Sequence, residues 1–264
     1  MNPVSVVIIT RNEETNIVDC IRSARLVSSD IIVVDSGSRD KTVEFARQEG
    51  AAVYSIPWTG YGQSRNYGAA SAKNNWIVSI DADERLSSKL ADSIRQLDLS
   101  DSNVIFKFRR ENYLGKRKIR FGTPGYDSVS RIYNRLHCQW DLTLVHEKLI
   151  GKDTKKKFIQ GPIIHYAFRN LADYRVKTCL YAQMSADKYK AEGRKASFVK
   201  RFISPLFNSV KSYVFQAGFL DGHHGFIIAK TIARYTWLKY YYLYQMNLQQ
   251  NPNNQQVHKT EQRD

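Results

Sequence analysis

The feature that most constrains this chain is an apolar run that ends abruptly in acids. Residues 76–84 read Trp-Ile-Val-Ser-Ile-Asp-Ala-Asp-Glu, so positions 81, 83 and 84 are acidic. The apolar part is typical of a buried strand, and open α/β sheets bind ligands at the carboxyl ends of their strands. Carboxylates placed there suit a hard cation such as Mg²⁺ or Mn²⁺, which also binds substrate phosphates. An isolated Asp-x-Asp would more often be a solvated turn, so the preceding sequence has to decide.

The preceding segments alternate between strand and helix patterns. Three runs rich in small or β-branched apolar residues are predicted strands: residues 4–10, 31–35 and 51–56. Helical spacing in residues 17–24 predicts a helix, with Asn12 as its N-cap. A second helix is predicted to follow residues 36–40 and to run to Gly50, a C′ glycine. This alternation predicts a parallel, right-handed, doubly wound sheet.

Polar side chains follow the predicted strands: Thr10, Asp35, and the pair Asp81 and Asp83. Because the carboxyl ends of parallel strands meet at one edge of a sheet, we expect these side chains to lie together. One polar strand end is more often a helix cap, but several together favour a nucleotide site. No G-x-G-x-x-G follows the first strand and no Walker-A lysine motif occurs, which argues against dinucleotide oxidoreductases and P-loop NTPases. Without a glycine cradle, a diphosphate needs a metal, which the two acids would hold.

Four ordered motifs resemble the family 2 glycosyltransferases, which have the GT-A fold. They are residues 7–14, 33–42, 62–70 and 81–84. The remainder is similar to the subgroup that adds glucose or a related sugar to the lipopolysaccharide inner core, through Val145-His146-Glu147, Pro205 and residues 218–222. The resemblance covers residues 1 to about 245 and is strongest in the first third. It implies an α/β fold, with a Rossmann-like nucleotide-binding open sheet followed by a basic C-terminal helical region.

The resemblance also implies a nucleotide-sugar pocket, with a UDP-sugar as donor. Thr10 and Glu13 would line its base and ribose part, and Asn12 would also bind the nucleotide-sugar. Asp35 would accept a hydrogen bond from the uracil N–H. Asp81 would lie near the ribose and the metal, and Asp83 would coordinate the metal, Mg²⁺ or Mn²⁺. Arg65 would approach the nucleotide from the following helix, although a surface helix arginine is an equally good interpretation.

Inverting sugar transfer needs a carboxylate that takes the proton of the acceptor hydroxyl. The family has an acid pair where this chain has His146-Glu147, and this departure leaves two candidates for the base. We favour Glu147 and keep Asp141 in reserve. His146 is an acceptor contact or a structural histidine. His165 resembles the histidine that completes the metal site in many GT-A enzymes, but a single histidine at a strand end is more often structural.

The length and composition indicate one globular protein with an appended region. At 264 residues and 42% hydrophobic content the chain buries a sizeable core. Its three cysteines show no metal or disulfide pattern, and the first strand begins too early for a signal peptide. No segment approaches the ~20 apolar residues of a membrane span. We therefore expect a cytoplasmic location.

The predicted organisation has three parts. Residues 1–168 would form the GT-A domain, with a nucleotide-sugar half at 1–100 and an acceptor half at 101–168. Residues 169–246 would form a helical, membrane-associating region. Residues 247–264, rich in Gln and Asn, would be a disordered tail.

Positive charge is concentrated in the second half. Residues 152–246 carry 17 Lys and Arg against 5 Asp and Glu, which is +12 of the total +15, and a second basic cluster at 109–118 suggests a β-hairpin. Nucleic-acid binding is the obvious rival, but no nucleic-acid motif occurs. The segments 198–203 and 226–242 mix basic and aromatic residues, which is typical of helices that face anionic lipid. A core-packing helix with a solvated basic face, or a surface for a phosphorylated acceptor, explains the same pattern.

The sequence therefore predicts a metal-dependent, inverting glycosyltransferase. It would transfer glucose or a related hexose from a nucleotide diphosphate donor to a lipopolysaccharide core or similar glycolipid. We expect it to be peripheral on the inner face of the cytoplasmic membrane. The alternatives are a lipid-phosphate or protein acceptor, and a non-catalytic basic module that binds membrane or nucleic acid.

Overall fold

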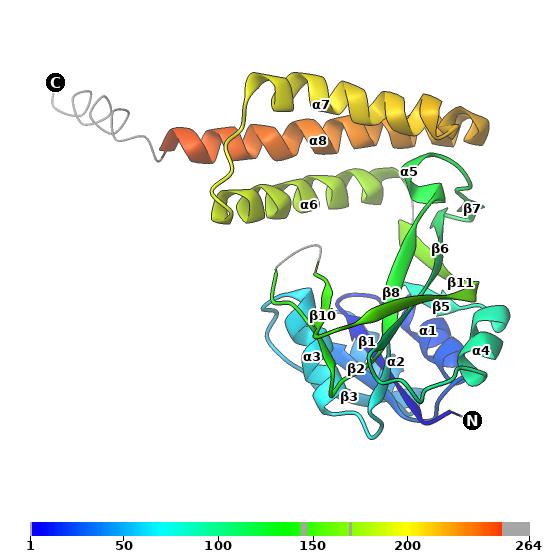
Figure 1. The fold of residues 1–264 in the computed structure, drawn as a ribbon. Coiled ribbons are helices and arrows are strands. Elements are labelled where there is room, and N and C mark those ends of the chain that lie inside the picture. The colour runs from blue at the N-terminus through cyan, green and yellow to red at the C-terminus, as the bar shows by residue number, and fades with distance from the viewer. Residues whose placement is uncertain (1, 144–146, 169–170, 250–264) are drawn as a thin grey trace, which may run out of the picture. The chain divides into compact units, whose positions relative to one another are not determined.

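The computed structural model describes residues 2–143, 147–168 and 171–249 (Figure 1). The chain forms two compact units, which we call the sheet unit and the helical unit. The sheet unit contains residues 1–118 and 126–167, and the helical unit contains residues 119–125 and 168–264. His146 and residues 250–264 of the expected tail lie outside the described residues, whereas residues 247–249 of that tail belong to a helix.

The first part of the sheet unit is the predicted parallel α/β arrangement. Its strands are β1 (Val4–Thr10), β2 (Ile31–Asp35), β3 (Ala52–Ser55) and β4 (Trp76–Asp81). They are parallel neighbours in the order β3-β2-β1-β4. The helices between them are α1 (Ile17–Ala24), α2 (Thr42–Gln48) and α3 (Tyr61–Ala70). The prediction of a parallel sheet is confirmed for these four strands.

Beyond β4 the sheet is mixed rather than parallel. The further strands are β5 (Glu84–Leu86), β6 (Val104–Leu114), β7 (Arg117–Lys118), β8 (Ser128–Asn134) and β11 (Lys155–Phe168). The order continues β4-β8-β6-β11-β5, with β8 antiparallel to both of its neighbours. The expected basic hairpin is confirmed as β6 and β7. Tight links of this kind join only antiparallel strands, since a parallel pair needs a long crossover.

The smaller elements of the sheet unit lie around these strands. Ser87 is the N-cap of helix α4 (Ser88–Arg95), and its side chain accepts a hydrogen bond from the backbone N–H of Leu90. Strands β9 (Cys138–Trp140) and β10 (Leu149–Gly151) form a separate antiparallel pair.

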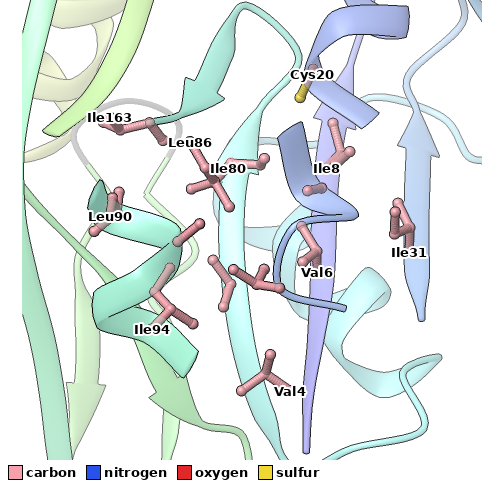
Figure 2. Packing of buried hydrophobic residues seen from close by; sticks show 14 of the residues in the cluster. Val4, Val6, Ile8, Cys20, Ile31, Ile80, Leu86, Leu90, Ile94 and Ile163 are labelled. Carbon is pink, nitrogen blue, oxygen red and sulfur yellow. The ribbon is translucent and has the colours of Figure 1, made fainter. Parts of the chain in front are cut away.

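The core lies on both faces of the parallel strands. On β1, Val4, Val6 and Ile8 belong to one cluster of buried residues, which Figure 2 shows, whereas Val7 and Ile9 belong to a second cluster. Strands covered on both faces have continuous apolar runs. The apolar runs of β1 and β2 are therefore explained by burial, and the polar residues at their ends are left for other roles.

One predicted cap is wrong and the other is confirmed. Helix α1 begins at Ile17, so Asn12 does not cap it. Asn12 instead has a left-handed backbone (φ 56°), and its side-chain oxygen accepts a hydrogen bond from the backbone N–H of Arg39 at 2.8 Å. Asn tolerates this conformation better than most residues. Gly50 follows α2 with φ 72°, as expected of a C′ glycine.

Between residues 171 and 249 the helical unit contains three long helices and two short ones. They are α6 (Leu171–Ala191), α7 (Phe198–Val210), the π-helix η1 (Lys211–Phe215), the 3₁₀-helix η2 (Gly218–Asp221) and α8 (His223–Gln249). Helix α8 packs against both α6 and α7 (Figure 1). The helices predicted at 198–203 and 226–242 are confirmed as parts of α7 and α8.

A short stretch between β7 and β8, residues 119–125 with helix α5 (Gly122–Gly125), also belongs to the helical unit. The buried carboxylate of Asp221 accepts hydrogen bonds from the backbone N–H groups of Arg120 and Phe121, at 3.0 and 2.9 Å. The hydroxyl of Ser212 accepts a third from the N–H of Thr123 at 3.0 Å. The helical unit thus satisfies the backbone of this stretch.

In the described ranges, no helix has both the length and the apolar content of a membrane span.

Candidate active site

The carboxyl ends of β1, β2 and β4 bring the predicted polar residues to one edge of the sheet. Thr10 and Asp35 are register partners on β1 and β2, and Asp81 on β4 is the partner of Ile9. The backbone N–H of Ala82 donates to the carbonyl of Ile9 at 3.1 Å, so the β4 ladder continues into the acidic turn. The expected meeting of these strand ends is confirmed.

Thr10 and Asp35 differ in how their polar atoms are satisfied. The Thr10 hydroxyl is buried, and it has no hydrogen-bond partner in the part of the chain that the structure describes. The Asp35 carboxylate accepts hydrogen bonds from the backbone N–H groups of Gly37 and Ser38, both at 3.1 Å, and from the Ser38 hydroxyl. An unsatisfied buried hydroxyl is costly. A ligand group beside Thr10 would remove that cost.

Asn12 and Glu13 lie on the loop that follows β1, beside the loop that follows β2. The backbone N–H of Asn12 donates to the Ser38 hydroxyl at 2.8 Å, and that of Glu13 donates to Thr42 Oγ1 at 2.8 Å. The Glu13 carboxylate accepts a bond from Asn16 at 2.7 Å. These two residues therefore border the edge that holds Thr10 and Asp35, and the side chain of Asn12 already serves to join the loops.

Two arginines bracket the carboxylate of Asp81. Arg65 Nη2 is 2.5 Å from Oδ1, and Arg131 Nη2 is 2.9 Å from Oδ2. Burial opposes ionisation of this carboxyl, but Arg131 and Arg65 outweigh it and hold the pKa of Asp81 well below its usual range. Both oxygens of Asp81 are thus occupied by guanidinium groups. This geometry suits charge positioning better than direct metal ligation.

Arg65 is a buried residue that reaches several groups at once. It is 2% exposed, which excludes the surface-arginine interpretation. Its Nη1 donates to Ser79 Oγ at 2.8 Å, its Nε is 3.3 Å from Glu147 Oε1, and its guanidinium lies 4.8 Å from the Trp140 ring centre. The planar fork of arginine makes these directed contacts possible, whereas lysine offers a point charge.

Three further residues of the Gly-Gln-Ser-Arg-Asn-Tyr-Gly segment on α3 have packing roles: Gly62, Asn66 and Gly68. Asn66 exchanges two hydrogen bonds with the backbone of Trp140, at 2.8 and 2.9 Å. A Cβ at Gly62 would collide with the backbone carbonyl of Asp141, and one at Gly68 would collide with a methyl of Val7. The glycines allow α3 to lie close to β1 and to the chain after β9, and this closeness brings Arg65 to Asp81.

No site role was predicted from the sequence for three residues that the structure places here: Glu84, Arg110 and Arg131. Glu84 is fully buried, and its Oε2 accepts the backbone N–H of Asp81 at 2.9 Å. Its Oε1 lies 3.5 Å from Arg110 and 3.6 Å from Arg131. Arg110, a member of the predicted basic cluster, also pairs with Asp127, so both of its acidic partners lie within the sheet unit. A signal for Arg131 was its position directly before Ile132 and Tyr133 in a strand-like stretch.

Asp83 and His165 come together from the turn that leads into β5 and from β11. Asp83 Oδ2 is 3.5 Å from His165 Nε2, and His165 Nδ1 is 2.6 Å from Asn112 Oδ1. Burial disfavours the charged imidazole, but Asp83 outweighs it and raises the pKa of His165. A hydrogen bond to the second ring nitrogen is what orients a ligating histidine.

The carboxylate of Asp83 and the imidazole of His165 fit a divalent cation whose other ligands come from a substrate. Within the described residues, no group of three or more His, Cys, Asp or Glu side chains is arranged to hold a metal. Mg²⁺ commonly takes one or two carboxylates and completes its shell with phosphate oxygens and water. Asp83 and His165 would therefore hold the cation, and the substrate would supply further ligands.

The two candidate bases are placed differently. Glu147 contacts Arg65 and is thereby connected to the strand-end acids, and its side chain is 13% exposed. Asp141 accepts hydrogen bonds from the hydroxyl and backbone N–H of Thr143, at 2.6 and 3.2 Å, within its own turn. The structure therefore joins Glu147, and not Asp141, to the network around Asp81.

Several proteins that are similar to this chain over most of its length are named as glycosyltransferases. An uncharacterised glycosyltransferase of Rickettsia bellii is 28% identical over 94% of this chain and 88% of its own length. The lipopolysaccharide core biosynthesis glycosyltransferase LpsC of Rhizobium meliloti is 29% identical over 95% of this chain and 96% of its own. A crystal structure of Mycobacterium tuberculosis glucosyl-3-phosphoglycerate synthase with Mn²⁺ and UDP-glucose is 28% identical, covering 42% of this chain and 43% of that chain, with a TM-score of 0.34.

The sequence profile of one family covers most of the sheet unit. Residues 5–172 match the model of Glycosyl transferase family 2, which is more than half of the chain. The matched range includes the strand ends, Arg65, Glu147 and His165. The predicted α/β GT-A fold class is confirmed. The chain belongs to glycosyl transferase family 2 and is a glycosyltransferase.

Proposed function

We propose that this glycosyltransferase transfers a hexosyl group from a UDP-sugar to a hydroxyl of a lipopolysaccharide core or similar glycolipid, with inversion. The observation that carries the proposal is the shared edge of the sheet. There the unsatisfied Thr10 hydroxyl and the Asp35 carboxylate lie at one pair of strand ends, and the Asp81–Arg65 pair lies at the next. A base and ribose would bind at the first position and the diphosphate at the second.

The choice of uracil rests on Asp35. An ionised carboxylate only accepts hydrogen bonds, and the imide N–H of uracil is a donor, whereas the corresponding ring nitrogen of cytosine is an acceptor. Asp35 is held by its own turn in a fixed orientation, which favours recognition of one base. Thr10 would contact the base or ribose through its free hydroxyl.

We propose that Asp83 and His165 hold Mg²⁺ or Mn²⁺. A divalent cation there would neutralise the negative charge that develops on the departing diphosphate. Arg131 and Arg65 fix the position and ionised state of Asp81 beside it. The buried Glu84 holds the backbone N–H of Asp81, and this bond shapes the turn that presents Asp83.

Glu147 is the proposed general base. The acceptor oxygen attacks the anomeric carbon from the face opposite to the diphosphate, the bond to the diphosphate breaks, and Glu147 takes the acceptor proton. Its contact with Arg65 uses Oε1 at 3.3 Å, and Arg65 is closer to Asp81, at 2.5 Å. Glu147 contacts Nε of Arg65 and Asp81 contacts Nη2, so one guanidinium positions both carboxylates.

The acceptor is proposed from charge and from similarity. Residues 152–246 carry a net charge of +12, which favours a phosphorylated, anionic acceptor at an anionic surface. The similarity to LpsC, named for lipopolysaccharide core biosynthesis, extends over 95% of the chain. We propose peripheral attachment to the inner face of the cytoplasmic membrane, where such a glycolipid would be available.

The test is a thermal-shift screen of UDP-, GDP- and dTDP-sugars with and without Mn²⁺, followed by assays of donor hydrolysis. We expect UDP-sugars to raise the melting temperature most, and Mn²⁺ to enlarge the shift. Stabilisation by another nucleotide class would overturn the assignment of the base. A metal-independent shift with undiminished hydrolysis in EDTA would overturn the assignment of Asp83 and His165.

A further inference from the structure

Helix α7 packs with its polar side inward. Its residues that face the rest of the helical unit are polar or small: Arg201, Ser204, Pro205, Asn208 and, one turn beyond, Ser212. Pro205 and Ser212 are buried, and Asn208 donates to Thr236 Oγ1 on α8 at 3.4 Å. These positions recur at helical spacing and form one face. The amphipathic pattern of α7 is therefore opposite to that of an ordinary packed helix.

The opposite side of α7 is apolar and exposed. We call it the outer face: Phe198, Val199, Phe202, Ile203, Leu206 and Phe207. These side chains are between 48% and 74% exposed, and the exposure continues through Phe215 at 76%. Contiguous apolar surface of this kind on a soluble unit marks an interaction site.

Basic side chains flank this surface on one side only. Lys200 and Lys211 are exposed and lie three helical turns apart, next to the outer face. Arg201, which the sequence also suggested as a lipid contact, has a different role. Its guanidinium lies 5.1–5.2 Å from the ring centres of Phe202, Tyr241 and Tyr244, so it joins α7 to α8.

We infer that the outer face of α7 inserts into the interfacial region of an anionic lipid bilayer, with Lys200 and Lys211 against the headgroups. This inference deepens the proposed membrane attachment by naming its surface. An exposed apolar face with a basic flank is the pattern of helices that lie in the plane of the membrane interface. Burial of large apolar side chains would supply most of the affinity, and the two lysines would supply the preference for anionic lipid.

The charge pattern favours lipid over the other possible occupants. From residue 197 to residue 249 there are six Lys and Arg and one acid, Asp221, which is buried. A second copy of the chain would bring like charges together on the flanks of this face. The C-terminal residues 250–264 include one aliphatic side chain, that of Val257, so their composition does not match an apolar surface.

The test is co-sedimentation of the full chain with vesicles of phosphatidylcholine alone and of equimolar phosphatidylcholine and phosphatidylglycerol. The double variant Phe202→Ser with Leu206→Ser removes two side chains of the outer face. Arg201 loses its contact with the Phe202 ring but keeps its contacts with Tyr241 and Tyr244 on α8. We expect its partition onto anionic vesicles to fall by ~10-fold or more. Lys200→Glu with Lys211→Glu should lower binding to anionic vesicles and flatten its salt dependence.

The matched control is Val176→Ser with Leu180→Ser on α6. These side chains are 70% and 57% exposed and have the same i, i+4 spacing as Phe202 and Leu206. We expect partition within about twofold of wild type. Equal losses in both double variants, or none in either, would overturn the inference. So would a dimer in sedimentation equilibrium that Phe202→Ser with Leu206→Ser dissociates while vesicle binding stays unchanged.

Donor hydrolysis in solution separates this inference from the proposed function. Every variant above should hydrolyse a UDP-sugar at the wild-type rate, since none changes a residue of the sheet unit. Loss of vesicle binding in a chain that hydrolyses no UDP-sugar, even as wild type, would support the surface and contradict the proposed donor. If the wild-type chain hydrolyses a UDP-sugar but the outer-face variants bind vesicles as well as wild type, only the proposed surface is contradicted.

Discussion

Arg65 Nη2 lies 2.5 Å from Oδ1 of Asp81, so a buried cation from α3 meets the acid at the end of β4. The same guanidinium is 3.3 Å from Glu147, which comes from a distant part of the sequence. One arginine thus sets the positions of an acid of the proposed donor site and of the proposed base. We regard Arg65 as a positioning residue for both.

Arg65→Lys should impair turnover more than folding. Lysine keeps the positive charge but cannot contact Ser79, Asp81 and Glu147 together. We expect kcat/KM to fall ~10²-fold or more, measured by release of UDP. The control is Arg22→Lys. The Arg22 side chain is 64% exposed and forms an ion pair with Glu49. An activity of Arg65→Lys equal to that of the control would contradict the positioning role.

Asp83→Asn and His165→Gln should each remove the effect of metal on donor binding. In either variant the cation would lose one of its two proposed protein ligands. The measurement is calorimetric titration with UDP in the presence and absence of Mn²⁺, and we expect affinity without metal to be unchanged. Asp98→Asn, at an exposed turn, is the control. Full activity of Asp83→Asn at ordinary metal concentration would show that the strand-end acid only closes a turn.

Glu147→Gln should lower kcat by ~10²- to 10⁴-fold, the usual worth of a general base, with little change in donor affinity. Glutamine keeps the size of the side chain but cannot accept the acceptor proton. Single-turnover kinetics with a saturating donor would measure the chemical step. Asp141→Asn is the companion variant, and we expect it to retain most activity. The opposite pattern would make Asp141 the base.

Thr10→Val should weaken UDP binding without destabilising the free protein. The Thr10 hydroxyl is buried and lacks a partner among the described residues, so its removal relieves a desolvation cost of about 1–3 kcal/mol. We expect the melting temperature of the free protein to stay the same or rise, while the affinity for UDP falls about 10-fold.

The matched control for that variant is Thr42→Val. Thr42 is also buried, but its hydroxyl accepts the backbone N–H of Glu13 and donates to Asp40. We therefore expect Thr42→Val to lower stability by about 1–2 kcal/mol. A loss of stability in Thr10→Val equal to that in Thr42→Val would mean that the Thr10 hydroxyl has a structural role.

The local parts of this site were predictable from sequence. Thr10, Asp35 and Asp81 end strands whose parallel direction follows from the strand–helix alternation, so their meeting at one edge depends on few long-range assumptions. Asn12 shows the limit of local rules. Asparagine is a preferred N-cap residue, but the Asn12 side chain accepts a hydrogen bond from the backbone N–H of Arg39, 27 residues away.

The buried charge network was not predictable, because its members come from strands whose pairing the sequence does not determine. Arg110 and Arg131 lie on β6 and β8, and their roles depend on Glu84, which lies on another strand. Helix α7 shows a related limit. Its periodicity indicates two faces, but only its contacts with α8 show that the polar face is the packed one.

Residues 119–125 have a consequence for how this protein is divided. The chain passes from the sheet unit to the helical unit, returns, and passes again before α6. Neither unit is therefore one continuous stretch of sequence. A truncated chain that ends at residue 167 would keep Arg120, Phe121 and Thr123 but would lack Asp221 and Ser212, which bind their backbone. Any truncation, domain exchange or circular permutation of this glycosyltransferase therefore has to keep residues 119–125 together with the helices of the helical unit.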